Sequence, residues 1–270
     1  MQRSLGSRTL HTFRTSGVRG FIRKVYRYGV RARKRIFFHP HTIDLHVYDT
    51  DLHFYIGDPI GEFWYSHFEP MTELGWIFEH LRPGDLLVDC GAHHGIISLL
   101  AAKKCGANVI AVEASPSSVE ILRRNVQLNQ ATVRVIHAAV SDRDGKVGFS
   151  NDSCGSVDES DGAVIVDSVA LDTLLTGTSP RVLKIDVEGA ELQALRGARK
   201  TIHTLRPILD LEVHSAMFSE PLSVISAIFE DLAPLAYRYE VQFDVNGDIF
   251  PLTSPFEELA KKERFLLFCS

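Results

Sequence analysis

The stretch Leu86–Gly95 constrains the fold of this chain more than any other part of its sequence. The apolar residues 86–88 lead to Asp89, and two glycines, Gly91 and Gly95, follow four positions apart. Residues 96–102 are apolar apart from one serine and predict a helix. A buried strand, a tight glycine turn and a helix N-terminus form the phosphate or nucleoside cradle of doubly wound folds. An ordinary strand-to-helix turn has the same spacing. Other parts of the chain must therefore show whether this turn binds a ligand.

The same region indicates which class of ligand such a cradle would bind. Ala92 and His93 follow Gly91, so the Gly-x-Gly-x-x-Gly pattern of dinucleotide binders is missing and a ligand without a pyrophosphate is favoured. Glu113 stands 24 positions after Asp89. In nucleotide-binding folds of this type, an acidic residue roughly 20 positions further along the chain hydrogen-bonds the ribose. A carboxylate can accept from both ribose hydroxyls. The alternative is an exposed acid at a strand end.

From residue 85 onward, predicted strands and helices alternate, which indicates a parallel sheet with helices on both faces. A polar excursion over 141–162 interrupts the alternation. The predicted strands are 86–90, 109–113, 133–137, 182–185, 208–213, 237–245 and 264–269, an apolar stretch lies at 164–169, and the predicted helices are 95–104, 116–128, 188–202 and 222–232.

The charge of the chain is unevenly distributed. Residues 1–40 hold eleven Lys or Arg and no Asp or Glu, whereas the whole chain has 29 basic and 34 acidic residues. This arm predicts contact with an anionic membrane surface or an acidic partner, and we find no specific nucleic-acid motif. A helix lying on the acidic domain and an organelle transit peptide are alternatives.

Three regions are predicted. Residues 1–40 form a basic extension with a short amphipathic helix at 21–28, residues 41–84 form a small N-terminal cap, and residues 85–270 form the main domain. Alternation of apolar and polar residues over 42–56 predicts a hairpin, and residues 60–81 are rich in aromatic side chains, with a helix near their end.

Cysteine usage and hydropathy bear on the compartment. The four cysteines are scattered without a Cys-x-x-Cys pair, which argues against a zinc ribbon and fits a reducing compartment. No apolar run approaches the ~18 residues of a membrane span. We therefore expect a cytoplasmic protein, with peripheral membrane contact through residues 1–40 left open.

Polar residues follow the ends of the predicted strands, and in a parallel sheet these ends meet at one edge. Lys184 and Asp186 share a strand face, and Glu188 falls at the mouth of the next predicted helix. Asp186 and Glu188 can position a hydroxyl or take its proton. The alternative for Glu188 and Glu191 is that both are acids of a helix's first turn.

Glu212 and His214 share a strand face in the same way, and such a pair can orient a hydroxyl nucleophile. A core histidine is the alternative. Asp186, Glu212 and His214, with His93 or His94, could hold a divalent ion, but these positions are not diagnostic and no metal site is predicted.

Several blocks of this chain, in order, resemble the FkbM family of class I S-adenosylmethionine-dependent methyltransferases, over roughly residues 69–269. They are Arg82-Pro83-Gly84-Asp85, Val88–Gly95, Ala111–Pro116, Asn125–Asn129, Ala138–Asp142 with Gly145, Leu171–Leu174, Lys184–Glu191 and Glu212-Val213-His214. The family usually has asparagine where His93 stands, and often an apolar residue at His94.

The resemblance implies a Rossmann-like, doubly wound α/β fold with a seven-stranded sheet whose last strand is antiparallel. It implies S-adenosyl-L-methionine as cofactor and methyl transfer to oxygen. The residues that match its binding motifs are Asp89, Gly91, Ala92, His93, Gly95, Glu113, Ala114, Ser141 and Asp142.

The catalytic candidates follow from strand-end position. Asp186 or His214 would serve as the base, with Glu188 and Glu212 orienting the acceptor, although alignment of the reacting atoms supplies much of the rate. The acceptor would be a hydroxyl of a sugar, glycolipid, polyketide or similar small molecule. A nicotinamide-dependent oxidoreductase and a catalytically silent nucleoside-binding module are the alternative functions.

Overall fold

The computed structural model describes residues 38–149, 163–244, 246–253 and 255–270. The chain divides into two compact units, residues 1–42 with 56–67 and residues 43–55 with 68–270, and each is considered by itself. Residues 1–37, which hold the predicted amphipathic helix, lie outside the described residues, as do residues 150–162.

The described part of the smaller unit contains helix α2 (Pro59–Tyr65). Asp58 caps this helix, because its Oδ1 accepts hydrogen bonds from the amides of Ile60 and Gly61 at 2.9 and 2.7 Å. Phe63 and Trp64 of the helix are exposed. The boundaries expected after residues 40 and 84, and the capping role of residues 41–84, stay predictions.

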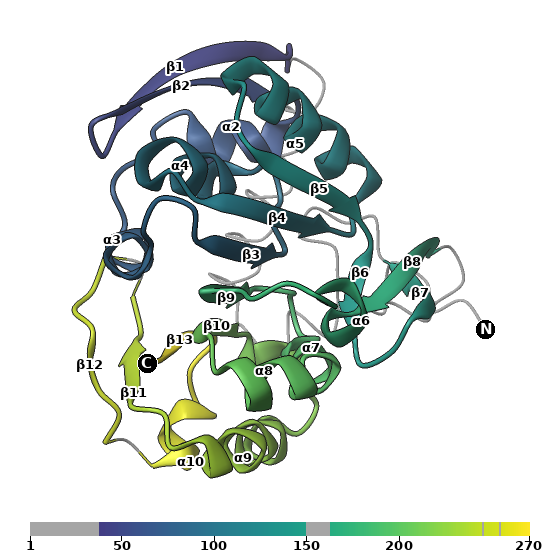
Figure 1. The fold of residues 1–270 in the computed structure, drawn as a ribbon, viewed down its shortest axis with the longest axis vertical. Coiled ribbons are helices and arrows are strands. Elements are labelled where there is room, and N and C mark those ends of the chain that lie inside the picture. The colour runs from purple at the N-terminus through teal and green to yellow at the C-terminus, as the bar shows by residue number, and fades with distance from the viewer. Residues whose placement is uncertain (1–37, 150–162, 245, 254) are drawn as a thin grey trace, which may run out of the picture. The chain divides into compact units, whose positions relative to one another are not determined.

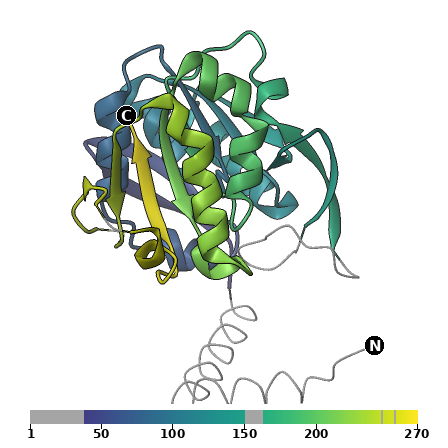
Figure 2. The same ribbon diagram turned by 90° about the horizontal axis from the view of Figure 1, so that it is seen from below.

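A mostly parallel sheet forms the centre of the larger unit (Figure 1). Strands β10, β9, β3, β4 and β5 run parallel, and β13, the yellow C-terminal strand in Figure 2, inserts antiparallel between β10 and β11. This confirms the doubly wound fold with an antiparallel last strand. A two-residue strand, β12, extends the seven expected strands to eight among the described residues. In sheet order they are β12 (Phe250–Pro251), β11 (Tyr239–Gln242), β13 (Phe265–Cys269), β10 (Ile208–Val213), β9 (Val182–Ile185), β3 (Leu86–Cys90), β4 (Asn108–Glu113) and β5 (Val133–His137).

Helices cover both faces of this sheet (Figure 1). Helices α7 (Glu191–Gly197), α8 (Arg199–Leu205) and α9 (Pro221–Leu232) bury the main apolar core on one face. Helices α3 (Thr72–His80), α4 (Ile96–Cys105) and α5 (Pro116–Asn129) lie on the other. The side chains that the central strands direct toward this first face are all apolar, because the helices bury that face. The shorter helices are α6 (Leu171–Leu174), η1 (Ser215–Met217), η2 (Ala233–Leu235) and α10 (Phe256–Leu259).

The structure corrects one expectation about local structure and adds detail to a second region. The helix expected over residues 188–202 begins only at Glu191 and is broken at Ala198 into α7 and α8. The reason is a turn at Glu188 and Gly189, which have φ angles of 49° and 95° in the left-handed region. The excursion expected over 141–162 contains a strand that pairs with its neighbours in a small sheet made of β6 (Ala139–Ser141), β8 (Val164–Ala170) and β7 (Gly145–Phe149).

The predicted hairpin is confirmed as β1 (His41–Val47) and β2 (Thr50–Ile56). Side-chain amides of α5 bind the backbone of β2 in the way a neighbouring strand would. Asn125 accepts from the amide of Tyr55 at 2.6 Å, and Asn129 both accepts from the amide of His53 at 3.0 Å and donates to its carbonyl at 2.8 Å. These bonds satisfy backbone groups that an isolated hairpin would leave to water.

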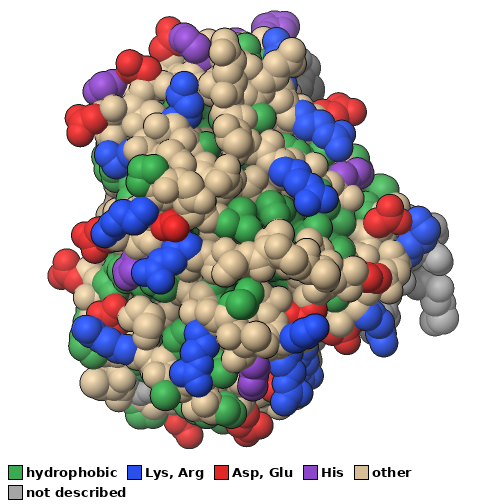
Figure 3. Space-filling model, in the orientation of Figure 1, with side chains coloured by type: hydrophobic (Ala, Val, Ile, Leu, Met, Phe, Trp, Pro, Cys, Tyr) green, Lys and Arg blue, Asp and Glu red, His purple; other side chains and the backbone are tan. Residues whose placement is uncertain are grey.

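Two surface properties of the described residues bear on where the protein could act, namely the distribution of charge and the presence of apolar helices. On the face drawn in Figure 3, acidic and basic side chains are interspersed rather than gathered by sign. Within the described ranges, no helix combines the length and the apolar character that crossing a membrane requires.

Candidate functional site

Three charged side chains lie in one row across the centre of the sheet. In the strand register, Lys184 of β9 stands opposite Asp89 of β3 on one side and Asp210 of β10 on the other. All three are buried, and the Lys184 ammonium lies 3.8 Å from the carboxylate of Glu73, which α3 contributes to the same face. An unpaired buried charge is costly, so this row depends on its internal pairing.

The carboxyls around Lys184 differ in their tendency to ionise. Burial alone would lower the pKa of Lys184, but Asp186 and Glu73 raise it above its ordinary value, so the ammonium stays charged. Burial raises the pKa of Glu73, and burial together with Glu73 raises that of Asp210 well above its usual range. Burial would also raise the pKa of Asp186, but Lys184, 3.1 Å from its Oδ2, holds it below the ordinary value. Lys184 and Asp186 therefore form the ion pair of this region.

A second row lies nearer the carboxyl edge of the sheet. Strand alternation places Glu113, Asp186 and Glu212 on the same face as Lys184, two residues further along their strands. Gly91 lets this edge close, because its φ is 83° and a Cβ there would overlap the carbonyl oxygen of Asp186. The structure thus brings together strand-end groups that the sequence expected to converge.

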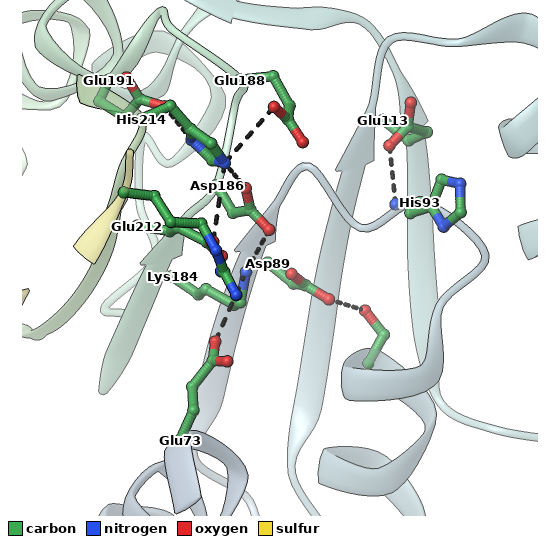
Figure 4. A network of polar contacts seen from close by, with 12 residues as sticks. Glu73, Asp89, His93, Glu113, Lys184, Asp186, Glu188, Glu191, Glu212 and His214 are labelled. Atoms are coloured by element: carbon green, nitrogen blue, oxygen red, sulfur yellow. Dashed lines mark hydrogen bonds and ion pairs between the residues drawn. The ribbon is translucent and has the colours of Figure 1, made fainter. Parts of the chain in front are cut away.

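Glu113 is held by backbone amides and has no cationic partner among the described contacts. Its Oε2 accepts from the amide of His93 and its Oε1 from the amide of Ser115, both at 2.7 Å (Figure 4). Burial raises the pKa of Glu113 to about 7, although the two amides counteract it. Each oxygen keeps a second lone pair, so the group can accept from two neutral hydroxyls of a ligand.

Asp89 lies deeper in the same half of the sheet. Its Oδ2 accepts from the hydroxyl of Ser98 on α4 at 2.6 Å, while the buried Oδ1 has no hydrogen-bond partner among the described residues. Burial raises the pKa of Asp89. An unsatisfied buried oxygen is costly, and it is a position where a ligand donor would be stabilising.

His214 lies at the centre of a group of carboxylates just beyond β10 (Figure 4). Its Nδ1 bonds to Oε1 of Glu191 at 2.9 Å. Its Nε2 lies 3.4 Å from Glu188, 3.7 Å from Glu212 and 3.9 Å from Asp186. Burial alone would lower the pKa of His214, but the bond to Glu191 and the charge of Asp186 raise it. The ring is therefore fixed with Nε2 toward the acidic groups.

Glu191 is the residue of this group that sequence reasoning missed as a functional candidate. It is the first residue of α7, as the alternative interpretation expected, but it is fully buried. Its Oε1 also accepts from the amide of Gly189 at 2.9 Å, which ties the turn containing Glu188 to His214. Its place in the block Lys184–Glu191 was the only signal in the sequence.

Other candidates lie apart from this group. The hydroxyl of Ser141 donates to Asp142, and Asp142 in turn pairs with Arg143, so these side chains bond to each other and not to Glu113 or Asp186 among the described residues. The rings of His93 and His94 stack at 3.9 Å, and His94 is fully buried. Among the described residues, neither histidine belongs to the group of possible metal ligands that contains His214. Ala92 and Ala114 stand in the turns after β3 and β4.

Comparison with known proteins now identifies the family. Residues 89–239, more than half of the chain, match the family described as the methyltransferase FkbM domain. The chain belongs to the FkbM methyltransferase family. This confirms the family that the sequence motifs resemble, and such a family implies S-adenosylmethionine as the methyl donor.

The individual relatives and solved structures that resemble this chain match it at low identity or over only part of their length. The hexuronic acid methyltransferase AglP of Haloferax volcanii is 24% identical over 161 residues, which cover 57% of this chain and 65% of AglP. The ribosomal protein L11 methyltransferase of Burkholderia cenocepacia is 42% identical over 67 residues, covering 24% of this chain and 22% of that protein. The crystal structure of the FkbM methyltransferase from Methylobacillus flagellatus KT aligns with a TM-score of 0.48 and 20% identity, covering 72% of this chain and 50% of that one. The chain thus spans less than two thirds of the length of each.

Proposed function

We propose that this protein transfers a methyl group from S-adenosylmethionine to a hydroxyl oxygen of a small acceptor. The chain belongs to the FkbM methyltransferase family, and one edge of its sheet carries two sets of acidic side chains. One set contains Glu113 and the other surrounds His214, and this arrangement carries the proposal. Glu113 can accept from neutral hydroxyls, and the group around Asp186 and His214 can hold charge and protons. Methyl transfer to a hydroxyl needs a bound donor, and a group that accepts the hydroxyl proton assists it.

On the donor side, the residues present fit a nucleoside with a charged tail. Glu113 would bind the ribose hydroxyls, and the orphaned Oδ1 of Asp89 would accept from an amino group. The remaining members of the proposed donor site are Gly91, Ala92, His93, Gly95, Ala114, Ser141 and Asp142. S-adenosylmethionine supplies a methyl group that its sulfonium has already activated.

On the acceptor side, Asp186 and His214 are proposed as the groups that touch the reacting hydroxyl. Lys184 keeps Asp186 ionised, so its free oxygen can accept the hydroxyl proton in a hydrogen bond. His214, held by Glu191, is the second candidate base, and Glu188 and Glu212 would orient the acceptor. Holding the oxygen in line with the methyl group supplies much of the rate.

A sugar hydroxyl is the acceptor we favour within the broader class of glycolipids, polyketides and similar small molecules. The relative AglP is named a hexuronic acid methyltransferase, which supports a carbohydrate acceptor. The polar side chains at the carboxyl edge suit such a molecule, because hydroxyl-rich ligands need donors and acceptors rather than an apolar wall.

The donor site is tested by calorimetry with S-adenosylhomocysteine. Wild-type protein should bind it, and Glu113→Ala should weaken binding by about 1–3 kcal/mol from lost hydrogen bonds to a charged group. The exposed Glu120→Ala on α5 is the matched control and should bind normally. Unchanged affinity in Glu113→Ala would remove Glu113 from the ribose.

The reaction itself is tested by mass spectrometry of products from a panel of hydroxylated acceptors. A methylated sugar is the expected product. Binding of NAD in place of S-adenosylhomocysteine would support the oxidoreductase alternative, and binding without any product would support the silent nucleoside-binding module.

The basic arm is proposed to contact an anionic membrane surface or an acidic partner. Its eleven positive charges without an acid support this. Deleting residues 1–40 should reduce binding to anionic vesicles at low salt and leave affinity for S-adenosylhomocysteine unchanged. If the shortened protein fails to fold, the arm is a structural element instead.

A further inference from the structure

We propose that His214, Asp186, Glu188 and Glu212 bind one divalent metal ion. The four residues come from the end of β9, the turn before α7 and the end of β10, so three separate segments supply the donor atoms. Binding of the ion follows from these residues alone. Its catalytic use, to hold the acceptor hydroxyl and lower its pKa, rests on the proposed function, and with the ion bound Asp186 and His214 would act on the hydroxyl through the ion rather than as free bases.

The spacing of the donor atoms fits a metal ion better than it fits hydrogen bonds. The three carboxylate oxygens lie 3.4–3.9 Å from Nε2 of His214, beyond the usual ~2.7–3.2 Å of a hydrogen bond. Two ligands held at ~2.1 Å from one ion lie roughly 3.0–4.2 Å apart. One donor atom from each of Asp186, Glu212 and His214 falls within 4.8 Å of the others, so these three form the core of the site. Glu188 is outside that set and is added as an outer ligand through its 3.4 Å distance to Nε2 of His214.

The imidazole is oriented as a ligand. His214 is about nine-tenths buried, and its Nε2, which makes no hydrogen bond among the described residues, points into the group of carboxylates (Figure 4). Nδ1 lies 2.9 Å from the fully buried Glu191, so the proton belongs on Nδ1 and the lone pair on Nε2. Metal-binding histidines almost always donate their second N–H to a carboxylate or carbonyl in this manner.

Among the described residues, the carboxylates around His214 outnumber the cations that face them, so an additional cation would be stabilised there. The carboxylates Asp186, Glu188, Glu191 and Glu212 surround the ring. Within the part of the chain that the structure describes, two cations face them: Lys184 contacts Oδ2 of Asp186 and Arg264 contacts Oε1 of Glu212. Lys184 must also offset the carboxyls in its own row. A divalent ion would bind on the side of Asp186 Oδ1, which Lys184 leaves open, and would compete with Arg264 for Glu212.

The donor set also selects the kind of ion. One imidazole nitrogen with carboxylate oxygens suits Mn²⁺, Fe²⁺, Co²⁺ or Zn²⁺ better than Ca²⁺, whose ligands are oxygen atoms. Mn²⁺ is the practical probe, because its paramagnetic signal changes when it binds.

The test measures Mn²⁺ binding to the full chain by calorimetry and by electron paramagnetic resonance, without donor or acceptor. Saturable binding of one ion is expected, and His214→Gln and Glu212→Gln should weaken it by at least about 10-fold. Glu188→Gln, in a partly exposed turn, is a milder variant that should also weaken binding if the buried substitutions misfold. The exposed Glu230→Gln on α9 is the matched control.

Absence of saturable Mn²⁺ binding at millimolar concentration would overturn the metal site, as would equal affinity in Glu188→Gln and Glu230→Gln. Calorimetry with S-adenosylhomocysteine on the same preparation separates the two proposals. Mn²⁺ binding without binding of that nucleoside would leave the metal site standing and contradict the methyltransferase proposal. The reverse result would overturn the metal site alone.

Discussion

The two halves of the sheet's carboxyl edge carry the same kind of side chain in different electrostatic settings. At the β3–β4 half, the main partners of Asp89 and Glu113 are neutral, a hydroxyl and two backbone amides, and burial raises both pKa values. At the β9–β10 half, the side chain of Asp186 is 26% exposed and has Lys184 beside it, and its pKa is lowered. A cationic partner together with partial exposure therefore keeps Asp186 ionised, whereas the other two carboxyls are buried with mainly neutral partners.

This difference divides the chemistry of the site. Carboxyls that bond only to neutral donors keep lone pairs that can accept hydrogen bonds from the hydroxyls of a ligand, and no ion pair has to be broken. A carboxylate held by a lysine keeps its charge at neutral pH, so it can orient or accept a proton during a reaction. The comparison predicts that charge-removing substitutions affect stability and turnover in one half, and ligand affinity in the other.

The largest effect is expected from Lys184→Met, which removes the cation of the β9–β10 half. Lys184 is buried and the side chain of Asp186 is only 26% exposed, so the carboxylate would lose its cation in a largely enclosed position. Breaking a buried pair costs about 3–5 kcal/mol, a loss that the partial exposure of Asp186 reduces. Urea denaturation followed by circular dichroism measures the loss. Lys146→Met is the control, because Lys146 pairs with Asp167 at 2.7 Å on the surface, where a pair contributes at most about 1 kcal/mol. Equal losses would mean that the two halves do not differ in charge dependence.

Asp186→Asn should follow in size. It keeps the shape of the side chain but removes its charge, so turnover at saturating donor and acceptor should fall by roughly 10²-fold or more. Affinity for S-adenosylhomocysteine should stay within a few-fold, because the donor is assigned to the other half. Asp167→Asn, at an exposed position of β8, is the control. Near-normal turnover of Asp186→Asn would mean that alignment alone drives the reaction.

The smallest effect concerns pH. The pKa of Glu113 is raised to about 7, and ribose hydroxyls would bind its ionised form. Affinity for S-adenosylhomocysteine should therefore rise by about 10-fold between roughly pH 6 and 8, and Glu113→Gln should abolish the rise. Calorimetry at several pH values measures it. A wild-type profile that matches Glu113→Gln would place the ligand elsewhere.

The raised pKa of Glu113 affects stability in the opposite direction, because a rise in pH lowers the free energy of unfolding. The folded protein binds more protons at Glu113 than the unfolded chain does between pH values of about 4.5 and 7. This group's contribution to the free energy of unfolding is therefore lost as pH rises through that window.

Much of the fold and part of the site could be predicted from local patterns. The alternation of strands and helices predicted the parallel sheet, and period-two spacing placed Lys184 and Asp186 on one face. The start of this helix at Glu191 rather than Glu188 could not be predicted this way, since residues 188–202 contain strong helix formers. The turn forms because Glu191 holds the amide of Gly189 while bonding to His214.

The sequence by itself determined which residues end the strands, because apolar runs, turns and alternation are local properties. Only the tertiary structure decided how those residues are paired. Asp89 and Asp210 become partners of Lys184 through strand register, and Glu191 becomes the partner of a histidine 23 residues away. In sequence, Glu191 is an acid at a helix start, where the dipole alone explains it. Its pairing depends on burial and on the packing of α7 beside β10, and no local pattern encodes either.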